Sequence, residues 1–161
     1  MAERTVYETR TFRLVVPERP HIPRADGGHL IIKSREQVFS SRADLSPAQA
    51  VEFIRLSMMA GEAMAAVLNR RGVAVGRINY QENGNWALRD GKTPFFHLHL
   101  YGRTMSARTQ TWGEALVFPN PAGGFYDGFE PLSEQDAAEI RAELQRLAQT
   151  ERYNTARWRA E

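Results

Sequence analysis

The sequence predicts an α+β domain, in which a mainly antiparallel sheet carries one long helix packed on it and a C-terminal helix. Two segments begin with a serine N-cap and continue with an apolar stripe at helical spacing, and several short segments rich in β-branched and aromatic residues are separated by proline and glycine. The 161 residues contain no internal repeat and no linker. We therefore expect a single domain over residues 1–161, with its core at about 12–118 and the C-terminal helix at about 133–150.

The strands are predicted from short apolar runs that end at turn-forming residues. In chain order the predicted strands cover residues 12–16, 29–33, 73–80, 93–100 and 116–118. Pro94 stands near the start of its strand, where the missing amide is tolerated. Residues 119–131 contain three glycines and three prolines and are expected to form a loop.

The two helices are predicted from their first turns. Ser46, Pro47 and Gln49 form a serine N-cap, a proline at the first helical position and a capping box, and the apolar stripe that follows continues to about residue 70. Gly72 suits the C-terminal cap of this helix. Ser133 begins the last helix with a similar pattern.

The composition limits which reactive groups and which binding partners are expected. Cysteine is absent, so disulfides, thiol nucleophiles and cysteine-ligated metal sites are excluded. The net charge is only +2, and the 21 basic residues, 19 of them arginine, are scattered among 19 acidic ones, so a long nucleic acid is not the expected partner. With no apolar run of spanning length and no secretory leader, we expect a cytoplasmic protein that does not enter membranes.

The most informative pattern is a pair of histidines, His97 and His99, in the strand over residues 93–100. Because side chains alternate along a strand, both histidines share one face with Phe95 and Tyr101, whereas the intervening residues point to the core. Two steps of strand rise place the two imidazoles roughly 7 Å apart. A pair on the polar side of an apolar strand favours a functional role over a structural one.

Three interpretations of this pair were compared. A metal site would need His21 or His29 as a third ligand, because no acidic residue follows His99 before Glu114. A phosphate-binding loop at residues 91–93 is rejected, because Trp86 stands where the first glycine is required. The third interpretation is attack of a neutral imidazole on phosphorus, with nearby donors that neutralise the phosphate oxygens. The donors close in sequence are Lys92, Thr93, Arg103 and the asparagines Asn79 and Asn83.

The residues around the pair resemble the histidine triad family of nucleotide hydrolases and transferases. That family carries three histidines at alternate positions of a strand, often after a proline and before a Pro/Gly-Arg pair. Residues 94–103, Pro-Phe-Phe-His-Leu-His-Leu-Tyr-Gly-Arg, follow that pattern with Phe95 at the first histidine. Residues 28–35, 44–47 and 78–84 are similar to the family's Gly-His strand, helix start and asparagine-bearing strand with its Asn-Gly turn, so the resemblance covers about residues 24–105.

The resemblance implies a role for each matched residue. His97 falls at the nucleophile that attacks the α-phosphate, and His99 falls at the third histidine, which contacts phosphate or supports the intermediate. His29 and the basic Arg35 are implied as substrate contacts, with Asn79 or Asn83 near ribose or phosphate, and the nucleoside between the His29 strand and the long helix. The resemblance also implies a homodimer and no cofactor.

The chain departs from the family pattern in three places. Phe95 replaces the first histidine, Gly91 and Lys92 stand near a Gln-Ser/Thr pair of many members, and Gln37 stands where a histidine often follows the basic residue. A second register, with His99 as the nucleophile and Tyr101 at the third position, loses the proline and misplaces Arg103. Variant triads exist in this superfamily, because its hexose-1-phosphate uridylyltransferase branch has glutamine at the third position.

Two functions follow as hypotheses. In the first, the chain is a histidine triad enzyme that hydrolyses or transfers a nucleoside monophosphate group, with a dinucleoside polyphosphate such as diadenosine polyphosphate, or a nucleoside phosphoramidate, as substrate. In the second, it is a nucleotide-binding or sensing module with weakened catalysis, which the phenylalanine at position 95 favours.

Overall fold

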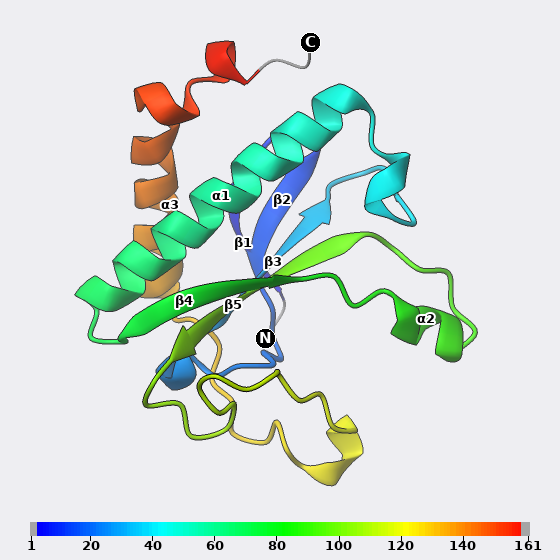
Figure 1. The fold of residues 1–161 in the computed structure, drawn as a ribbon, viewed down its shortest axis with the longest axis vertical. Helices are drawn as coiled ribbons and strands as arrows, with labels where there is room; N and C mark the ends of the chain where they lie inside the picture. Colours follow the sequence, from blue (N-terminus) through cyan, green and yellow to red (C-terminus); the bar gives the residue numbers. More distant parts are fainter. Residues whose placement is uncertain (1–2, 159–161) are drawn as a thin grey trace.

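A five-stranded antiparallel sheet is the centre of the fold in the computed structural model, which describes residues 3–158 except the side chain of Asn85. The strand order is β1-β2-β3-β5-β4, so β5 lies between β3 and β4, and β4 forms one edge (Figure 1). The strands are β1 (Arg4–Glu8), β2 (Phe12–Val16), β3 (His29–Ser34), β4 (Val75–Gln81) and β5 (His97–Thr104). The predicted α+β class is confirmed.

Two long helices cover one face of the sheet. Helix α1 (Pro47–Arg70) crosses this face, and α3 (Glu134–Ala148) packs beside α1 and β1 (Figure 1). Both capping boxes form as predicted, because the Ser46 and Ser133 hydroxyls accept from the backbone amides three residues on. At the end of α1 the chain turns at Gly72, whose φ of 81° is the left-handed conformation that glycine adopts without strain.

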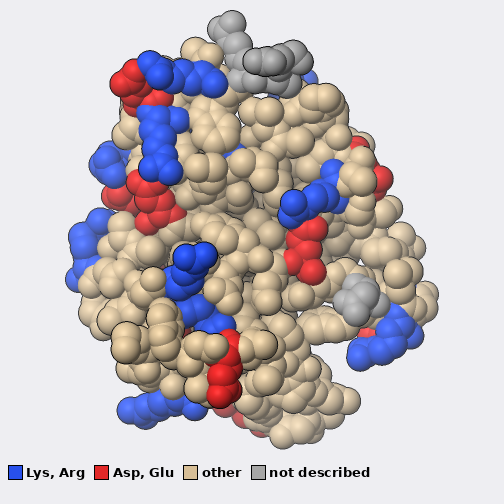
Figure 2. Space-filling model, viewed as in Figure 1, with Lys and Arg blue, Asp and Glu red and all other residues tan. Residues whose placement is uncertain are grey.

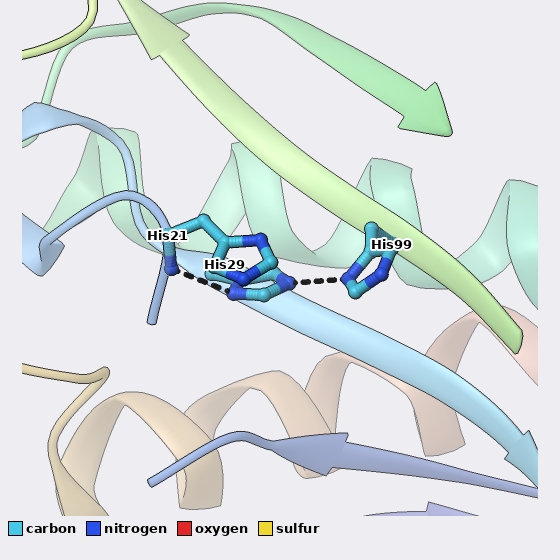
Figure 3. A group of neighbouring side chains, drawn as sticks. All are labelled: His21, His29 and His99. Atoms are coloured by element: carbon cyan, nitrogen blue, oxygen red, sulfur yellow. Dashed lines mark hydrogen bonds between the residues drawn. The ribbon is translucent and has the colours of Figure 1, made fainter. Parts of the chain in front are cut away.

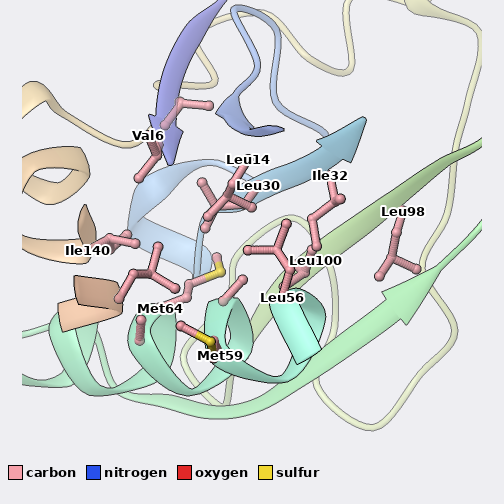
Figure 4. Close-up of a cluster of buried hydrophobic side chains, with 14 of the residues drawn as sticks. Val6, Leu14, Leu30, Ile32, Leu56, Met59, Met64, Leu98, Leu100 and Ile140 are labelled. Carbon is pink, nitrogen blue, oxygen red and sulfur yellow. The ribbon is translucent and has the colours of Figure 1, made fainter. Parts of the chain in front are cut away.

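The main core fills the space between the sheet and these helices. Alternate residues of β3 and β5 face α1, and Leu30, Ile32, Leu98 and Leu100 are buried there against Met64 and its neighbours (Figure 4). The predicted alternation along residues 95–101 is therefore confirmed. The space between the His29 strand and the long helix is lined by these core side chains, and the nucleoside site expected there stays a prediction.

Several element boundaries differ from the prediction. Strand β5 begins at His97 rather than at residue 93 and continues to Thr104, and Leu116–Phe118 form no strand. Strand β1 and the short helix α2 (Asn85–Arg89) were not predicted. Strand β1 buries only Val6 and depends on pairing with β2 and on Arg141, which donates to the backbone carbonyls of Thr5 and Val6.

Loops cover the opposite face of the sheet. A small second cluster there joins Ile22 and Leu116 to the fully buried Tyr101 of β5. The loop before β3 lies directly on β5, where a Cβ atom at Gly102 would stand 2.0 Å from the Gly27 carbonyl oxygen. Only glycine allows this approach, which fixes the start of β3 beside the middle of β5.

The surface carries charges of both signs. In the view of Figure 2, lysine and arginine side chains alternate with aspartate and glutamate, and no continuous basic patch appears on this face. None of the helices within residues 3–158 combines the length and the apolar character that crossing a bilayer requires.

Candidate active site

Four histidines gather on the loop-covered face of the sheet. His97 and His99 extend from β5, and His29 extends from the start of β3. His21 lies in the loop before β3, beside His29 and His99 (Figure 3). The register brings them together, because His29 pairs with Tyr101 and Ile31 pairs with His99 across the two strands. The ring centroids of His97 and His99 lie 4.7 Å apart, closer than the strand rise alone suggests, because the rings lean toward each other.

The tautomer of His97 is set by its own backbone. Nδ1 of His97 lies 2.9 Å from the carbonyl oxygen of Phe95. Because a carbonyl oxygen only accepts hydrogen bonds, Nδ1 carries the proton, and Nε2 of the neutral ring keeps its lone pair. Burial lowers the pKa of His97, which favours this neutral form.

A chain of hydrogen bonds fixes two more tautomers in sequence. The backbone amide of His21 donates to Nδ1 of His29 at 3.1 Å, so His29 carries its proton on Nε2. That Nε2 lies 2.8 Å from Nδ1 of His99 and donates to it (Figure 3). His99 therefore carries its own proton on Nε2 and presents a neutral N–H donor.

Burial keeps these two rings uncharged. His29 is 1% exposed, and desolvation lowers its pKa well below the usual value. Burial likewise lowers the pKa of His99 to about 2. The hydrogen-bond chain is therefore a row of neutral rings that starts at a main-chain donor and ends at the N–H of His99.

His21 and Tyr101 complete the group. Nδ1 of His21 lies 2.7 Å from the Tyr101 hydroxyl, and burial raises the pKa of this hydroxyl, which stays protonated. The aromatic rings of Trp86, Phe118 and Tyr126 surround His21 at centroid distances of 5.3–6.2 Å. From the sequence, His21 was expected only as an alternative metal ligand. It lies eight residues before His29, across a loop, and no local sequence pattern predicts its contacts with His29 and Tyr101.

Two buried polar atoms next to the histidines, one in Gln81 and one in Asn83, lack a hydrogen bond of ordinary geometry within the described residues. Gln81 pairs with His99 across β4 and β5, and its Oε1 atom is buried without a hydrogen bond. Nδ2 of Asn83 is buried and unpaired as well, and Asn83 lies near enough to Tyr101 to lower the pKa of its hydroxyl through a hydrogen bond. Asn83 was predicted as a site residue. Gln81 was missed, although its alternation with Asn79 indicated the same face.

The other predicted site residues lie at varying distances from the histidines. Arg35 follows β3, where it donates to the carbonyl of Thr9, and Lys92 and Thr93 are exposed beyond α2. No contact among the described residues joins these three side chains to the histidines. Asn79 and Arg103 share the sheet face of the histidines farther along the strands.

Arg103 differs most from its expected setting. We expected this side chain to contact phosphate or to end the strand in solvent. It is instead 4% exposed, and Nη2 donates to the carbonyls of Thr111 and Glu114 in the loop that returns over the sheet.

Phe95 lines the site and leaves the reactive edge of His97 free. The ring is 46% exposed and stacks on the imidazole of His97 at a centroid distance of 4.4 Å. A stacked ring covers the face of the imidazole, whereas the lone pair of Nε2 lies in its plane. The phenylalanine at the first triad position therefore covers the face of the His97 ring and not the in-plane lone pair of Nε2.

Three of the histidines lie close enough together to be considered as metal ligands, but two of them are hydrogen-bonded to each other. His21, His29 and His99 offer ring nitrogens within 4.8 Å of one another, a set that omits His97. Tetrahedral zinc at its usual bond lengths separates two nitrogens by about 3.3 Å. His29 and His99 are joined instead by a 2.8 Å hydrogen bond, and the other nitrogen of His29 already accepts from a backbone amide.

Solved structures with a similar fold are histidine triad proteins. A histidine triad protein from Marinobacter aquaeolei superposes with a TM-score of 0.60 at 18% identity, over 91% of this chain and 88% of that one. A zinc-bound histidine triad family protein from Mycobacterium smegmatis gives 0.57 at 19% identity, over 89% and 84% of the two chains. A uridylyltransferase gives 0.50 at 15% identity, over 89% of this chain but only 41% of that enzyme.

At the level of sequence, no protein-family model and no curated protein matches the chain. The structural comparisons nevertheless agree over about nine-tenths of its length. The resemblance drawn from residues 24–105 is thus confirmed at the level of the fold, and the chain has the histidine triad fold.

Proposed function

We propose that this chain hydrolyses or transfers a nucleoside monophosphate group, with Nε2 of His97 as the nucleophile. The observation that carries the proposal is the hydrogen bond from Nδ1 of His97 to the Phe95 carbonyl, which leaves a lone pair on a partly exposed ring. The histidine triad fold supports a dinucleoside polyphosphate or a nucleoside phosphoramidate as the substrate class.

The reaction would proceed in two displacements. Nε2 of His97 forms a bond to the α-phosphorus as the bond from phosphorus to the leaving oxygen or nitrogen breaks, and the leaving group keeps the electron pair and takes a proton from water. The proton stays on Nδ1, which donates it in a hydrogen bond to the Phe95 carbonyl, and this bond stabilises the positive charge of the substituted ring. Water or another acceptor then attacks phosphorus and releases His97 as a neutral imidazole.

Donors beside His97 would bind the phosphate oxygens. The Nε2 proton of His99 and the unpaired Nδ2 of Asn83 are both available for a ligand oxygen. Preorganised donors of this kind stabilise the charge that develops in the transition state. Arg35, Lys92 and Thr93 stay predictions as substrate contacts, since reaching the phosphates would require their side chains to move.

The proposal is tested by trapping the covalent intermediate. Protein mixed with radiolabelled diadenosine polyphosphate is denatured in alkaline detergent, because phosphohistidine survives base and hydrolyses in acid. We expect labelled protein from the wild type and none from His97→Ala, with turnover lost in this variant. Turnover by the wild type without labelled protein, together with an unchanged rate in His97→Ala, would contradict the mechanism.

The alternative is a nucleotide-binding module, and one observation favours it. Phe95 stacks on His97 where the family has a histidine, so this position supplies no imidazole for proton transfer. Calorimetry with adenosine monophosphate beside the turnover assay separates the two functions. Binding without turnover would favour the module.

A homodimer is part of the proposal, since the sheet offers an open edge. Strand β4 has a partner on one side only within the described chain, and a cavity of about 360 Å³ runs between it and α1 past Gly61 and Tyr80. An unpaired edge strand of seven residues is a template for a second strand. Light scattering after gel filtration measures the state, and a monomer at all concentrations would contradict a dimer. Cytoplasmic localisation and the lack of a long nucleic acid partner stay predictions of the sequence.

A further inference from the structure

A second cavity lies on the histidine-bearing face of the sheet, beyond Tyr101. It measures about 360 Å³ and lies between β4, β5 and the loop that returns after β5. Its lining residues are Gly76, Arg77, Asn79, Arg103, Trp112, Gly113 and Glu114. Arg103 follows His99 by four residues along β5, about 13 Å at the usual strand rise, so the cavity is distinct from the histidine group.

Two arginines from neighbouring strands line this cavity, and one of them, Arg77, also lines the cavity between β4 and α1. Arg77 and Arg103 are direct partners in the register of β4 and β5, which brings their Cβ atoms to about 5 Å. Like charges directly opposite each other destabilise a sheet, and a bound anion would offset this repulsion. Within residues 3–158 neither guanidinium forms an ion pair, and the Glu114 carboxylate, which also lines the cavity, lies beyond ion-pair distance from both.

Arg103 is fixed by two hydrogen bonds and has further N–H donors that these bonds do not use. The two carbonyls that it contacts, of Thr111 at 2.6 Å and Glu114 at 3.2 Å, engage Nη2 alone. A guanidinium has five N–H donors, so those on Nε and Nη1 have no acceptor among the described residues. Arg103 lines the cavity although it is only 4% exposed. Burial lowers the pKa of Arg103.

The remaining wall is aromatic. The six-membered ring of Trp112 lies against Gly76, where a Cβ atom would approach Cη2 to 2.9 Å, and the indole remains 38% exposed. A glycine at this position thus lets the indole lie close to β4. The exposed ring offers a stacking surface next to the two guanidinium groups, and Asn79 adds an amide.

We propose that this cavity binds a small molecule in which a phosphate or carboxylate is joined to an aromatic ring. The anionic group accepts hydrogen bonds from the guanidinium groups of Arg77 and Arg103, and the ring stacks on Trp112. The proposal does not depend on the reaction at His97.

The test uses the indole N–H signals of the ¹⁵N-labelled protein, with Trp112 assigned from the spectrum of Trp112→Phe. Phenyl phosphate, benzoate and benzyl alcohol are titrated in parallel. We expect phenyl phosphate to move the Trp112 signal to saturation and benzyl alcohol to leave it in place. The comparison of benzoate with phenyl phosphate identifies which anionic group the cavity prefers.

Matched variants localise the binding. Arg77→Gln should weaken phenyl phosphate binding about tenfold, the loss expected for one charge-assisted hydrogen bond. Arg13→Gln removes a partly exposed strand arginine outside the cavity, and it should bind like the wild type, as should His97→Ala. Arg77 is preferred to Arg103 for substitution, because it makes no contact that holds the loop. Equal binding by Arg77→Gln, or an equal shift with benzyl alcohol, would overturn the proposal.

Discussion

The two faces of the sheet are built on opposite principles, although single strands contribute to both. On the α1 side, Leu98 and Leu100 of β5 join a continuous apolar core. On the other side, His97 and His99 from the same strand join a network of nitrogen donors and acceptors. Neighbouring positions of β5 therefore enter the apolar core and the proposed reaction site in turn, and substitutions on the two faces test whether stability and activity depend on different positions.

The largest effect on the free energy of unfolding is expected on the apolar face. Leu100 is fully buried, so Leu100→Ala leaves a cavity and should cost about 2–5 kcal/mol. Met105→Ala, at a residue that is 81% exposed, should stay within about 0.5 kcal/mol. Equilibrium unfolding in urea measures both. Similar losses in the two variants would show that the core is not where the structure places it.

Acid should destabilise the protein through the histidine face. His29 and His99 have pKa values lowered by burial, whereas the unfolded chain titrates near about 6.5. The unfolded state then binds more protons, so the contribution is complete above about pH 6.5 and is lost as the pH falls. Below that pH, each of the two histidines lowers the free energy of unfolding by about 1.4 kcal/mol per pH unit. For the pair, the loss over the first pH unit is about 2–3 kcal/mol.

Urea unfolding at a series of pH values measures this slope, and His29→Gln serves as the comparison. Removal of one buried imidazole should make the slope shallower. An identical pH dependence in this variant and in the wild type would mean that His29 is not the acid-sensitive group.

The hydrogen-bond chain itself is expected to contribute less. His29→Leu leaves the His21 amide and Nδ1 of His99 without partners and should cost about 1–3 kcal/mol. His29→Gln retains a side-chain amide donor and should recover part of that loss. ¹⁵N chemical shifts of His99 report its tautomer, with the proton on Nε2 in the wild type and exchange between both nitrogens in His29→Leu. The same tautomer in His29→Leu would contradict the role of His29 as a positioning residue.

The smallest effect on stability is expected at the reactive ring. His97 is partly exposed and its one hydrogen bond is to a neighbouring backbone carbonyl, so His97→Ala should change the free energy of unfolding by no more than about 0.5 kcal/mol. Its turnover should nevertheless be lost. A stability loss as large as that of Leu100→Ala would mean that the two faces are not separable.

The apolar face was predictable because its signals are local. The serine cap at Ser46, the stripe along residues 47–70 and the alternation of residues 95–101 each depend on a few neighbouring residues. Strand β1 lacked such a signal, because it buries only Val6 and is stabilised by its pairing with β2.

The histidine face was only partly predictable, since its contacts cross loops. His97 and His99 were identified from their spacing, and their tautomers follow from Phe95 and from the amide of His21. The loop that buries Arg103 returns through residues 105–118 without a regular hydrophobic period, so the arginine was expected to contact phosphate or to end the strand in solvent. Long-range contacts of this kind are specified by the assembled fold rather than by neighbouring residues.

The first donor in the hydrogen-bond chain of His29 and His99 is the main-chain N–H of His21. If an ionisable side chain supplied this hydrogen bond instead, its charge would change with pH, and many single substitutions would remove it. A backbone amide is retained by every substitution except proline, which lacks it. Most substitutions at position 21 therefore leave the His29 tautomer unchanged. The positions of the protons on His29 and His99 are then kept even where the residue at position 21 differs.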